Sequence, residues 1–196
     1  MNPSFSTLIK EIKACRSCRN LFSFEPHPIV YGNQDCKIMQ ISQAPSIQAQ
    51  KASLPFSDAS GRKLRHLWYQ IPDEVFYNPK NFYISAISHC YPGKNPNGND
   101  NKPPRICADK WLIQEVKLVN SRLIVLIGRY AADYFFPNID FHELVFNDQN
   151  INGKPVIVLP HPSPLNQKWL KDYPDFERIR LPQIRRLIHQ VLHYNE

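Results

Sequence analysis

The segment Val156–Asn166 (VIVLPHPSPLN) holds a histidine in a rigid stretch of chain. Prolines precede and follow His161, and each proline fixes its own φ and disfavours helix in the residue before it. The first four residues of the segment, Val156–Leu159, are apolar and are expected to form a short buried strand. We therefore expect the imidazole at a strand end, where open α/β sheets bind ligands and where it can donate a hydrogen bond. The alternative is a proline-rich strand exit with a histidine satisfied inside the fold.

Cysteines form the second group of residues that can do chemistry. Cys15 and Cys18 are separated by two residues, so both thiols can bind one metal centre from a single turn. Cys90 follows Cys18 after 71 residues, and Cys107 follows Cys90 after 16. Four thiolates at element ends suit either a 4Fe–4S cluster or a tetrahedral zinc, and the spacing does not decide between them. The alternative is unrelated buried cysteines, and Cys36 is expected to be a core residue.

Composition narrows the class of protein. The 196 residues suffice for one full core, and we expect a single domain, 1–196. The net charge of +7 favours a polyanionic partner, nucleic acid first, although a merely basic protein is the alternative. Because the chain has no long apolar run and no apolar signal core, we expect no membrane span and a cytoplasmic location. Five cysteines in such a chain favour metal or cluster ligation over disulfides.

The hydrophobic pattern predicts strands that alternate with helices, which is typical of a parallel sheet covered on both faces. The expected strands are Lys37–Ser42, Phe82–Ser88, Arg122–Ile127 and Val156–Leu159, with a brief edge strand at Phe141–Phe146. The expected helices are Phe5–Ala14, Gly61–Gln70 with Ser60 as its N-cap, Cys107–Val119, Tyr130–Phe135 and Phe176–Tyr194. Gln43–Ser60 is expected to be a long loop, and Tyr91–Arg105 a surface excursion rather than a domain boundary.

Five short motifs occur in one order along most of the chain. They are the Cys15/Cys18 pair; QAPS at Gln43–Ser46 with Pro55-Phe56 and Ser60-Gly61; CYPG at Cys90–Gly93 with Cys107; Gly128-Arg129 with Ala131; and HPSPL at His161–Leu165. Each motif is weak alone. Together, in this order, they resemble the uracil-DNA glycosylase superfamily, and most closely its iron–sulfur branch, family four and its bacterial relatives.

The resemblance implies a three-layer α/β/α sandwich with a small, mainly parallel four-stranded central sheet. It also implies a monomeric DNA glycosylase of base-excision repair. Such an enzyme flips out uracil, or another deaminated base, and hydrolyses its N-glycosidic bond. The implied partner is therefore DNA that contains such a base. The implied cofactor is a 4Fe–4S cluster on Cys15, Cys18, Cys90 and Cys107, with zinc as the fallback.

The resemblance also assigns roles that suit the chemistry of the side chains. His161 would donate a hydrogen bond to the uracil O2 as negative charge develops on the leaving base. Phe56 would stack on the flipped ring, unless it is a core aromatic, and Leu165 would enter the base stack as an apolar wedge. The other residues expected to contact DNA are Ser163, Pro164, Arg62 and Lys63. For the two basic residues the alternative is an ordinary solvated helix face.

The chain departs from the branch at two positions. Gln43 stands where the branch carries glutamate; an amide can orient water but cannot deprotonate it, and Asp58 is the nearest downstream carboxylate. Ala86 stands where the branch reads uracil with asparagine, so that reader is missing unless Asn33 or Gln43 replaces it. Ala44 is expected to line the base site. These departures leave a second hypothesis open, a non-catalytic iron–sulfur DNA-binding module of the same fold.

Overall fold

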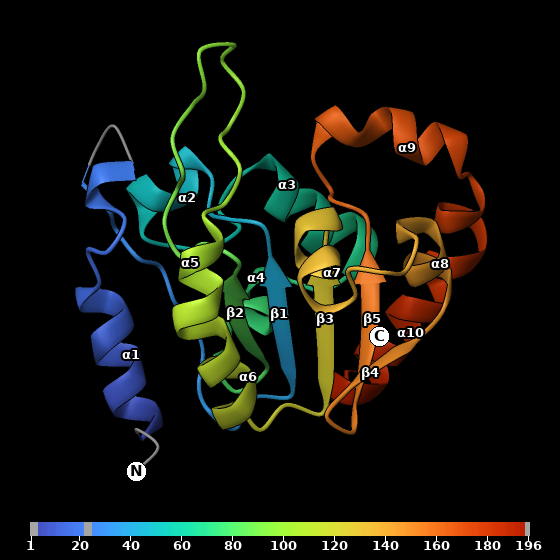
Figure 1. Cartoon of the computed structure of the whole chain (residues 1–196). Coiled ribbons are helices and arrows are strands. Elements are labelled where there is room, and N and C mark those ends of the chain that lie inside the picture. Colours follow the sequence, from blue (N-terminus) through green and yellow to red (C-terminus); the bar gives the residue numbers. More distant parts are fainter. Residues whose placement is uncertain (1–3, 22–24, 195–196) are drawn as a thin grey trace.

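Short helices alternate with strands in the computed structural model, which describes residues 4–21 and 25–194 (Figure 1). The strands are β1 (Ile38–Ser42), β2 (Phe82–Ala86), β3 (Leu123–Ile127), β4 (Gln149–Ile151) and β5 (Lys154–Leu159). The α-helices are α1 (Phe5–Ala14), α2 (Ile47–Ala52), α3 (Ala59–Arg62), α4 (Asp73–Phe76), α5 (Arg105–Cys107), α6 (Ile113–Leu118), α7 (Arg129–Phe135), α8 (Phe141–Phe146), α9 (Gln167–Asp172) and α10 (Leu181–Leu192). The 3-10 helices are η1 (Arg19–Leu21) and η4 (Pro164–Asn166). The π-helical segments are η2 (Lys63–Tyr69), η3 (Ala108–Leu112) and η5 (Phe176–Arg180).

The strands form one sheet in the order β2-β1-β3-β5-β4. All neighbours are parallel except β4, which pairs antiparallel with β5. Every residue of β1, β2 and β3 is buried, as expected for strands covered on both faces. The predicted α/β fold with a mainly parallel sheet is confirmed. Its strand count was one too low, because the short and polar β4 joins β5 through the turn at Asn152-Gly153.

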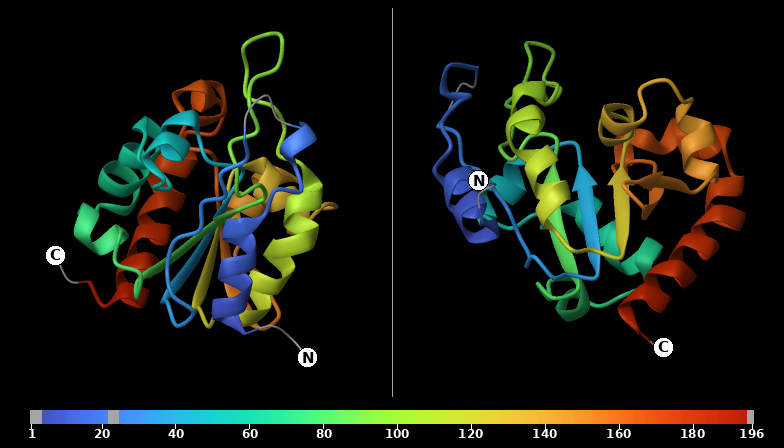
Figure 2. Two further views of the ribbon diagram at one scale, coloured as in Figure 1. Left: turned by 90° about the vertical axis from the view of Figure 1, so that its left-hand side faces the viewer. Right: turned by 60° about the horizontal axis from the view of Figure 1, so that its bottom comes forward.

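Helices cover both faces of the sheet and complete the three layers (Figure 2). On one face, α6 lies over β2, where the Tyr83 hydroxyl donates to Glu115 over 2.6 Å. On the other face, the ring of Tyr69 in η2 stacks on Phe82 with centroids 6.2 Å apart, and α10 packs against η2. Successive residues of one strand, Phe82 and Tyr83, thus face different layers, as strand geometry requires.

The strand predicted at Phe141–Phe146 is wrong, because this segment is the helix α8. Its buried residues follow helical spacing, with Leu144 and Val145 three and four positions after Phe141. The Asp140 carboxylate caps the helix by accepting from the backbone N–H of His142 over 2.8 Å. A six-residue apolar segment does not by itself distinguish a strand from a helix.

Two other predicted segments contain helical turns. The loop predicted at Gln43–Ser60 contains α2, which begins after Ser46; its hydroxyl accepts from the backbone N–H of Ala49 over 3.2 Å. The stiff segment after β5 includes the short turn η4. The predicted excursion at Tyr91–Arg105 is the hairpin that rises above α5 in Figure 1. None of the helices described here is long and apolar enough to cross a lipid bilayer.

The order of the strands fixes the place of a ligand site. The chain enters the sheet at β1, adds β2 on one side and β3 on the other. The direction of chain progression therefore reverses between β1 and β3. In open α/β sheets, ligands bind at this point, outside the carboxyl ends of the strands.

Candidate active site and cysteine site

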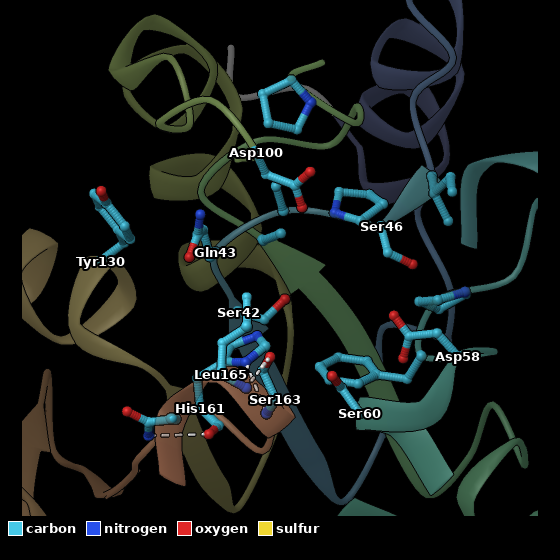
Figure 3. A pocket seen from close by; sticks show the side chains of 18 of the residues that line it. Ser42, Gln43, Ser46, Asp58, Ser60, Asp100, Tyr130, His161, Ser163 and Leu165 are labelled. Atoms are coloured by element: carbon cyan, nitrogen blue, oxygen red, sulfur yellow. Dashed lines mark hydrogen bonds between the residues drawn. The ribbon is translucent and has the colours of Figure 1, made fainter. Parts of the chain in front are cut away.

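A pocket of about 610 Å³ lies at the carboxyl ends of the parallel strands (Figure 3). The predicted site residues that line it are Gln43, Ala44, Phe56, Asp58, Ala86, His161, Ser163 and Leu165. Residues that the sequence analysis did not assign to the site also line it, among them Ser42, Ser46, Ser60, Ser85, Lys94, Asp100, Tyr130 and Asn166. Ser42 lies at the carboxyl end of β1 and Ser85 near the carboxyl end of β2. A polar residue at the end of an apolar strand is the sequence signal that could have identified these two serines. The pocket thus gathers segments more than 100 residues apart.

His161 is partly buried at the end of β5, and its ring is held in one tautomer. The backbone N–H of Ser163 donates to Nδ1 over 3.2 Å, so in the neutral ring Nε2 carries the proton. Burial lowers the pKa of His161, while the facing carboxylate of Asp58 raises it by a smaller amount. The side-chain amide of Asn166 donates to the His161 carbonyl over 3.1 Å. The site therefore presents a neutral imidazole with a free N–H donor.

Gly128 brings a neighbouring turn against this imidazole. It ends β3 and begins α7 with φ +84°, a conformation that L side chains rarely adopt. A Cβ at this position would lie 3.4 Å from the Cβ of His161. Glycine therefore lets the chain turn from strand to helix while staying in contact with the histidine loop.

Leu165 projects from the same loop and is 91% exposed. The Ser163 hydroxyl accepts from the backbone N–H of Leu165 over 3.2 Å, which fixes the turn that carries it. A single large apolar side chain this exposed lacks packing partners in the protein. Its position at the pocket rim leaves it available to a ligand.

The Phe56 backbone is held in an uncommon conformation beside the pocket. Its φ is +56°, and its carbonyl accepts hydrogen bonds from the guanidinium of Arg65 over 2.7 Å and from the Tyr77 hydroxyl over 3.1 Å. Gly61 makes this conformation possible, since a Cβ there would lie 1.7 Å from the Phe56 oxygen. The ring meets Phe76 edge to face. The aromatic is thus partly packed yet still lines the pocket.

Asp58 has a structural role in addition to its place in the pocket. Its Oδ1 accepts from the backbone N–H of Gly61 over 2.9 Å and caps α3. The predicted N-cap, Ser60, is wrong because the helix begins at Ala59, two residues earlier than predicted, with Asp58 as its N-cap. Gln43 lies across the pocket after β1, and its carbonyl accepts from the N–H of Ser88 over 3.1 Å.

Some predicted residues lie outside the pocket. Asn33, expected as a possible base reader, does not line the pocket: it is exposed, and its backbone N–H donates to the Pro79 carbonyl near the amino end of β2. The ammonium of Lys63 lies 5.0 Å from the Trp68 ring centroid. Arg62, like Pro164, is exposed and does not line the pocket. Their contacts with DNA stay predictions.

Arg65→Met is expected to lower the free energy of unfolding by about 2–3 kcal/mol, because buried Arg65 also bonds Asp73 over 2.6 Å. It should also raise KM for a substrate that stacks on Phe56. Urea unfolding measures the first effect and steady-state kinetics the second. Arg62→Met, an exposed neighbour, is the matched control and should change stability by less than about 0.5 kcal/mol. Equal losses of unfolding free energy in the two variants would contradict the structural support that Arg65 gives to Phe56.

The four predicted ligand cysteines meet at a second, smaller cavity. Cys15 and Cys18 reach it from the end of α1, Cys90 from the segment after β2, and Cys107 from α5. The rest of the lining includes the apolar side chains Ile12 and Trp111 and the polar residue His89. Cys36 lies elsewhere, buried in the main core, as predicted.

Four soft sulfur donors around one cavity are the ligand set of a 4Fe–4S cluster and also of a tetrahedral zinc ion. Burial raises the pKa of the Cys90 thiol to about 12, and the thiols of Cys107, Cys18 and Cys15 contribute to that shift. The four sulfurs are therefore electrostatic neighbours.

Fold and pocket together define an α/β protein with a pocket at the switch point of a parallel sheet, the place where such proteins bind ligands. Residues 29–185 match the family described as the Uracil DNA glycosylase superfamily. The chain belongs to this superfamily, which confirms the resemblance found in its motifs.

Three relatives carry the name type-4 uracil-DNA glycosylase. The protein from Archaeoglobus fulgidus is 26% identical over 139 residues, which cover 70% of this chain and 66%, just under two thirds, of the relative. The protein from Saccharolobus solfataricus is 25% identical over 186 residues, covering 87% and 82% of the two chains. The protein from Sulfurisphaera tokodaii is 26% identical over 199 residues, covering 90% and 84%. Similarity thus extends over most of the chain.

Proposed function

We propose that this protein is a monofunctional DNA glycosylase that excises uracil from DNA in base-excision repair. The observation that carries the proposal is the loop after β5, which combines a tautomer-fixed His161 in the pocket with Leu165 exposed at its rim. The names of the type-4 relatives and the net charge of +7 support a uracil-containing DNA partner.

The expected reaction begins with extrusion of the uracil nucleotide into the pocket. Leu165 fills the vacated position in the duplex, and the ring of Phe56 stacks on the flipped base. The N–H on Nε2 of His161 donates to the uracil O2 as the N-glycosidic bond breaks and negative charge develops on the base. Water then attacks C1′ of the sugar, oriented by the side-chain amide of Gln43. The products are free uracil and an abasic site.

The second hypothesis is a binding module without catalysis. Gln43 and Ala86 both line the pocket, so neither the glutamate nor the asparagine of the branch is present at these positions. Asp58 faces the same space, but its carboxylate already caps α3. If the glycosidic bond breaks before water attacks, the water needs orientation more than deprotonation. An amide at position 43 is then sufficient, which favours the enzyme.

The cysteine site would hold a 4Fe–4S cluster through Cys15, Cys18, Cys90 and Cys107. When bound, the cluster supplies a reducible centre that joins α1 to the segment after β2. These four residues remain the proposed ligands. No step of the base excision described above uses the cluster. A single-domain organisation, a monomeric state and a cytoplasmic location also stay predictions.

Leu165→Ala is expected to reduce binding or turnover on duplex DNA more than on single-stranded DNA, because only a duplex leaves a gap in a base stack. Paired measurements of Kd and of the single-turnover rate on both substrates test this. Leu67→Ala is a matched control, since Leu67 is 62% exposed on η2 and does not line the pocket. Equal losses on the two substrates would remove the wedge role.

A gel assay tests the proposed activity. Oligonucleotides that contain uracil, hypoxanthine or xanthine are incubated with the purified protein and then treated with alkali. A strand break at uracil is expected, and an undamaged oligonucleotide should stay intact. Salt-sensitive binding without any strand break would replace the enzyme with the binding module.

A further inference from the structure

A buried polar group between β2 and α6 takes no part in the proposed reaction. Glu115 is 0% exposed, and its carboxylate accepts from the Tyr83 hydroxyl over 2.6 Å and from the Ser85 hydroxyl over 3.0 Å. Both carboxylate oxygens also lie 3.1 Å from Nε2 of His89, which is 1% exposed. Since a carboxylate accepts only, Nε2 carries the proton between them.

The other side of His89 faces one of the four cysteines. Its Nδ1 lies 3.3 Å from Sγ of Cys107, and its backbone N–H donates to the same sulfur over 3.4 Å. The backbone of His89 is also linked to a residue of the base pocket. Ile29, which lines the pocket, donates its N–H to the His89 carbonyl over 2.8 Å. A continuous polar contact thus runs from Glu115 through His89 to the sulfur of Cys107.

The polarity of this pair needs a physical reason. A buried acid–imidazole pair seldom stabilises a fold more than well-packed apolar side chains of the same volume. Hydrogen bonds to the sulfurs of an iron–sulfur cluster, however, are among the factors that set its reduction potential. Residues behind metal ligands also fix ligand orientation. The pair has the position and the donor groups for both tasks.

We infer that His89, backed by Glu115, is a positioning residue that holds the Cys107 sulfur and sets the reduction potential of the metal centre. The inference rests on the cluster included in the proposed function. It assigns a role to two residues of this chain that lie outside the base pocket. A metal-bound thiolate only accepts hydrogen bonds, so with the cluster in place both Nδ1–H and the backbone N–H of His89 donate to the Cys107 sulfur and stabilise the reduced, more negative cluster. Glu115 accepts from Nε2 and fixes the orientation of the ring.

The test is a redox titration of the full-length, cluster-loaded protein, followed by visible absorption and without DNA. In His89→Leu/Glu115→Leu, apolar side chains replace the pair and no buried carboxylate is left unpaired. At a fixed potential, the ratio of reduced to oxidised cluster in this variant should be about tenfold lower than in the wild type. For a one-electron couple this corresponds to a midpoint potential about 59 mV lower. The control is Gln40→Leu/Tyr69→Phe, which removes a buried polar pair with a 2.8 Å hydrogen bond on the opposite face and should leave the potential unchanged.

Each outcome decides the inference. A wild-type potential in His89→Leu/Glu115→Leu, at equal iron content, overturns it. If that variant does not fold, Glu115→Gln takes its place: a smaller shift in the same direction supports the inference, and no shift overturns it. Because the titration contains no DNA, a wild type that holds iron but excises nothing overturns only the proposed activity. A wild type without iron overturns the cluster assignment and this inference with it.

Discussion

His161→Ala is expected to slow single-turnover excision of uracil from a duplex by about 10²–10³-fold while DNA binding stays nearly intact. The substitution removes the one imidazole N–H aimed at the departing base, which the Ser163 backbone holds in place. Most of the barrier reduction in a dissociative reaction comes from stabilising that base. The rate is measured with enzyme in excess over a labelled duplex, at matched iron content.

Substitutions on the opposite side of the pocket separate this mechanism from general-base catalysis. Gln43→Ala should reduce the rate by less than His161→Ala, and Gln43→Glu should raise it. Asp58→Asn retains a side-chain oxygen that can cap α3, so it should have a small effect. If Asp58→Asn abolished excision while His161→Ala barely mattered, the fold assignment would stand and the mechanism would be wrong.

Cys107→Ala is expected to remove most of the iron from the purified protein, since a 4Fe–4S cluster requires four thiolates and the cavity offers four. Cys90→Ala should have the same effect. Iron and acid-labile sulfide per chain, together with the brown colour of the preparation, are the measurements. Loss of the cluster would also remove one of the links between α1 and the rest of the fold, so the midpoint of thermal unfolding should fall.

Cys36→Ala is the matched control, because Cys36 is also buried but lies in the main core. It should leave the iron content unchanged. If it lowered that content as much as Cys90→Ala does, the four ligands would be misassigned. One zinc per chain and no iron would remove the iron–sulfur assignment but keep the four-thiolate site.

The main sheet was predictable because its strands are short runs of mainly apolar residues. Lys37–Ser42 and Arg122–Ile127 show this pattern, and they become the central strands β1 and β3. Phe141–Phe146 failed because six apolar-rich residues fit either period, and its N-cap at Asp140 decides the matter only once the backbone is known. β4 was missed because it has only three residues, Gln149–Ile151, and two of them are polar.

The base pocket was predictable as far as its residues follow strands. His161 and Gln43 come directly after β5 and β1, and parallel strands bring such positions to one edge. Asn33 lies away from the pocket because its segment is bonded to the chain near the amino end of β2, whereas the pocket lies at the carboxyl ends of the strands. The support of Phe56 by Arg65 depends on a contact nine residues apart whose geometry no sequence pattern encodes. Glu115, in the middle of a helix, gave no signal of its burial beside His89.

The most direct test of the account identifies the products of the reaction. A uracil-containing duplex is incubated with the wild-type protein. The masses of the uracil-containing strand, the protein and the released base are then measured by mass spectrometry. The account predicts free uracil, a strand that contains one abasic site, and protein of unchanged mass. A strand that keeps its uracil, or a covalent adduct between protein and DNA, would contradict hydrolysis of the glycosidic bond by this pocket.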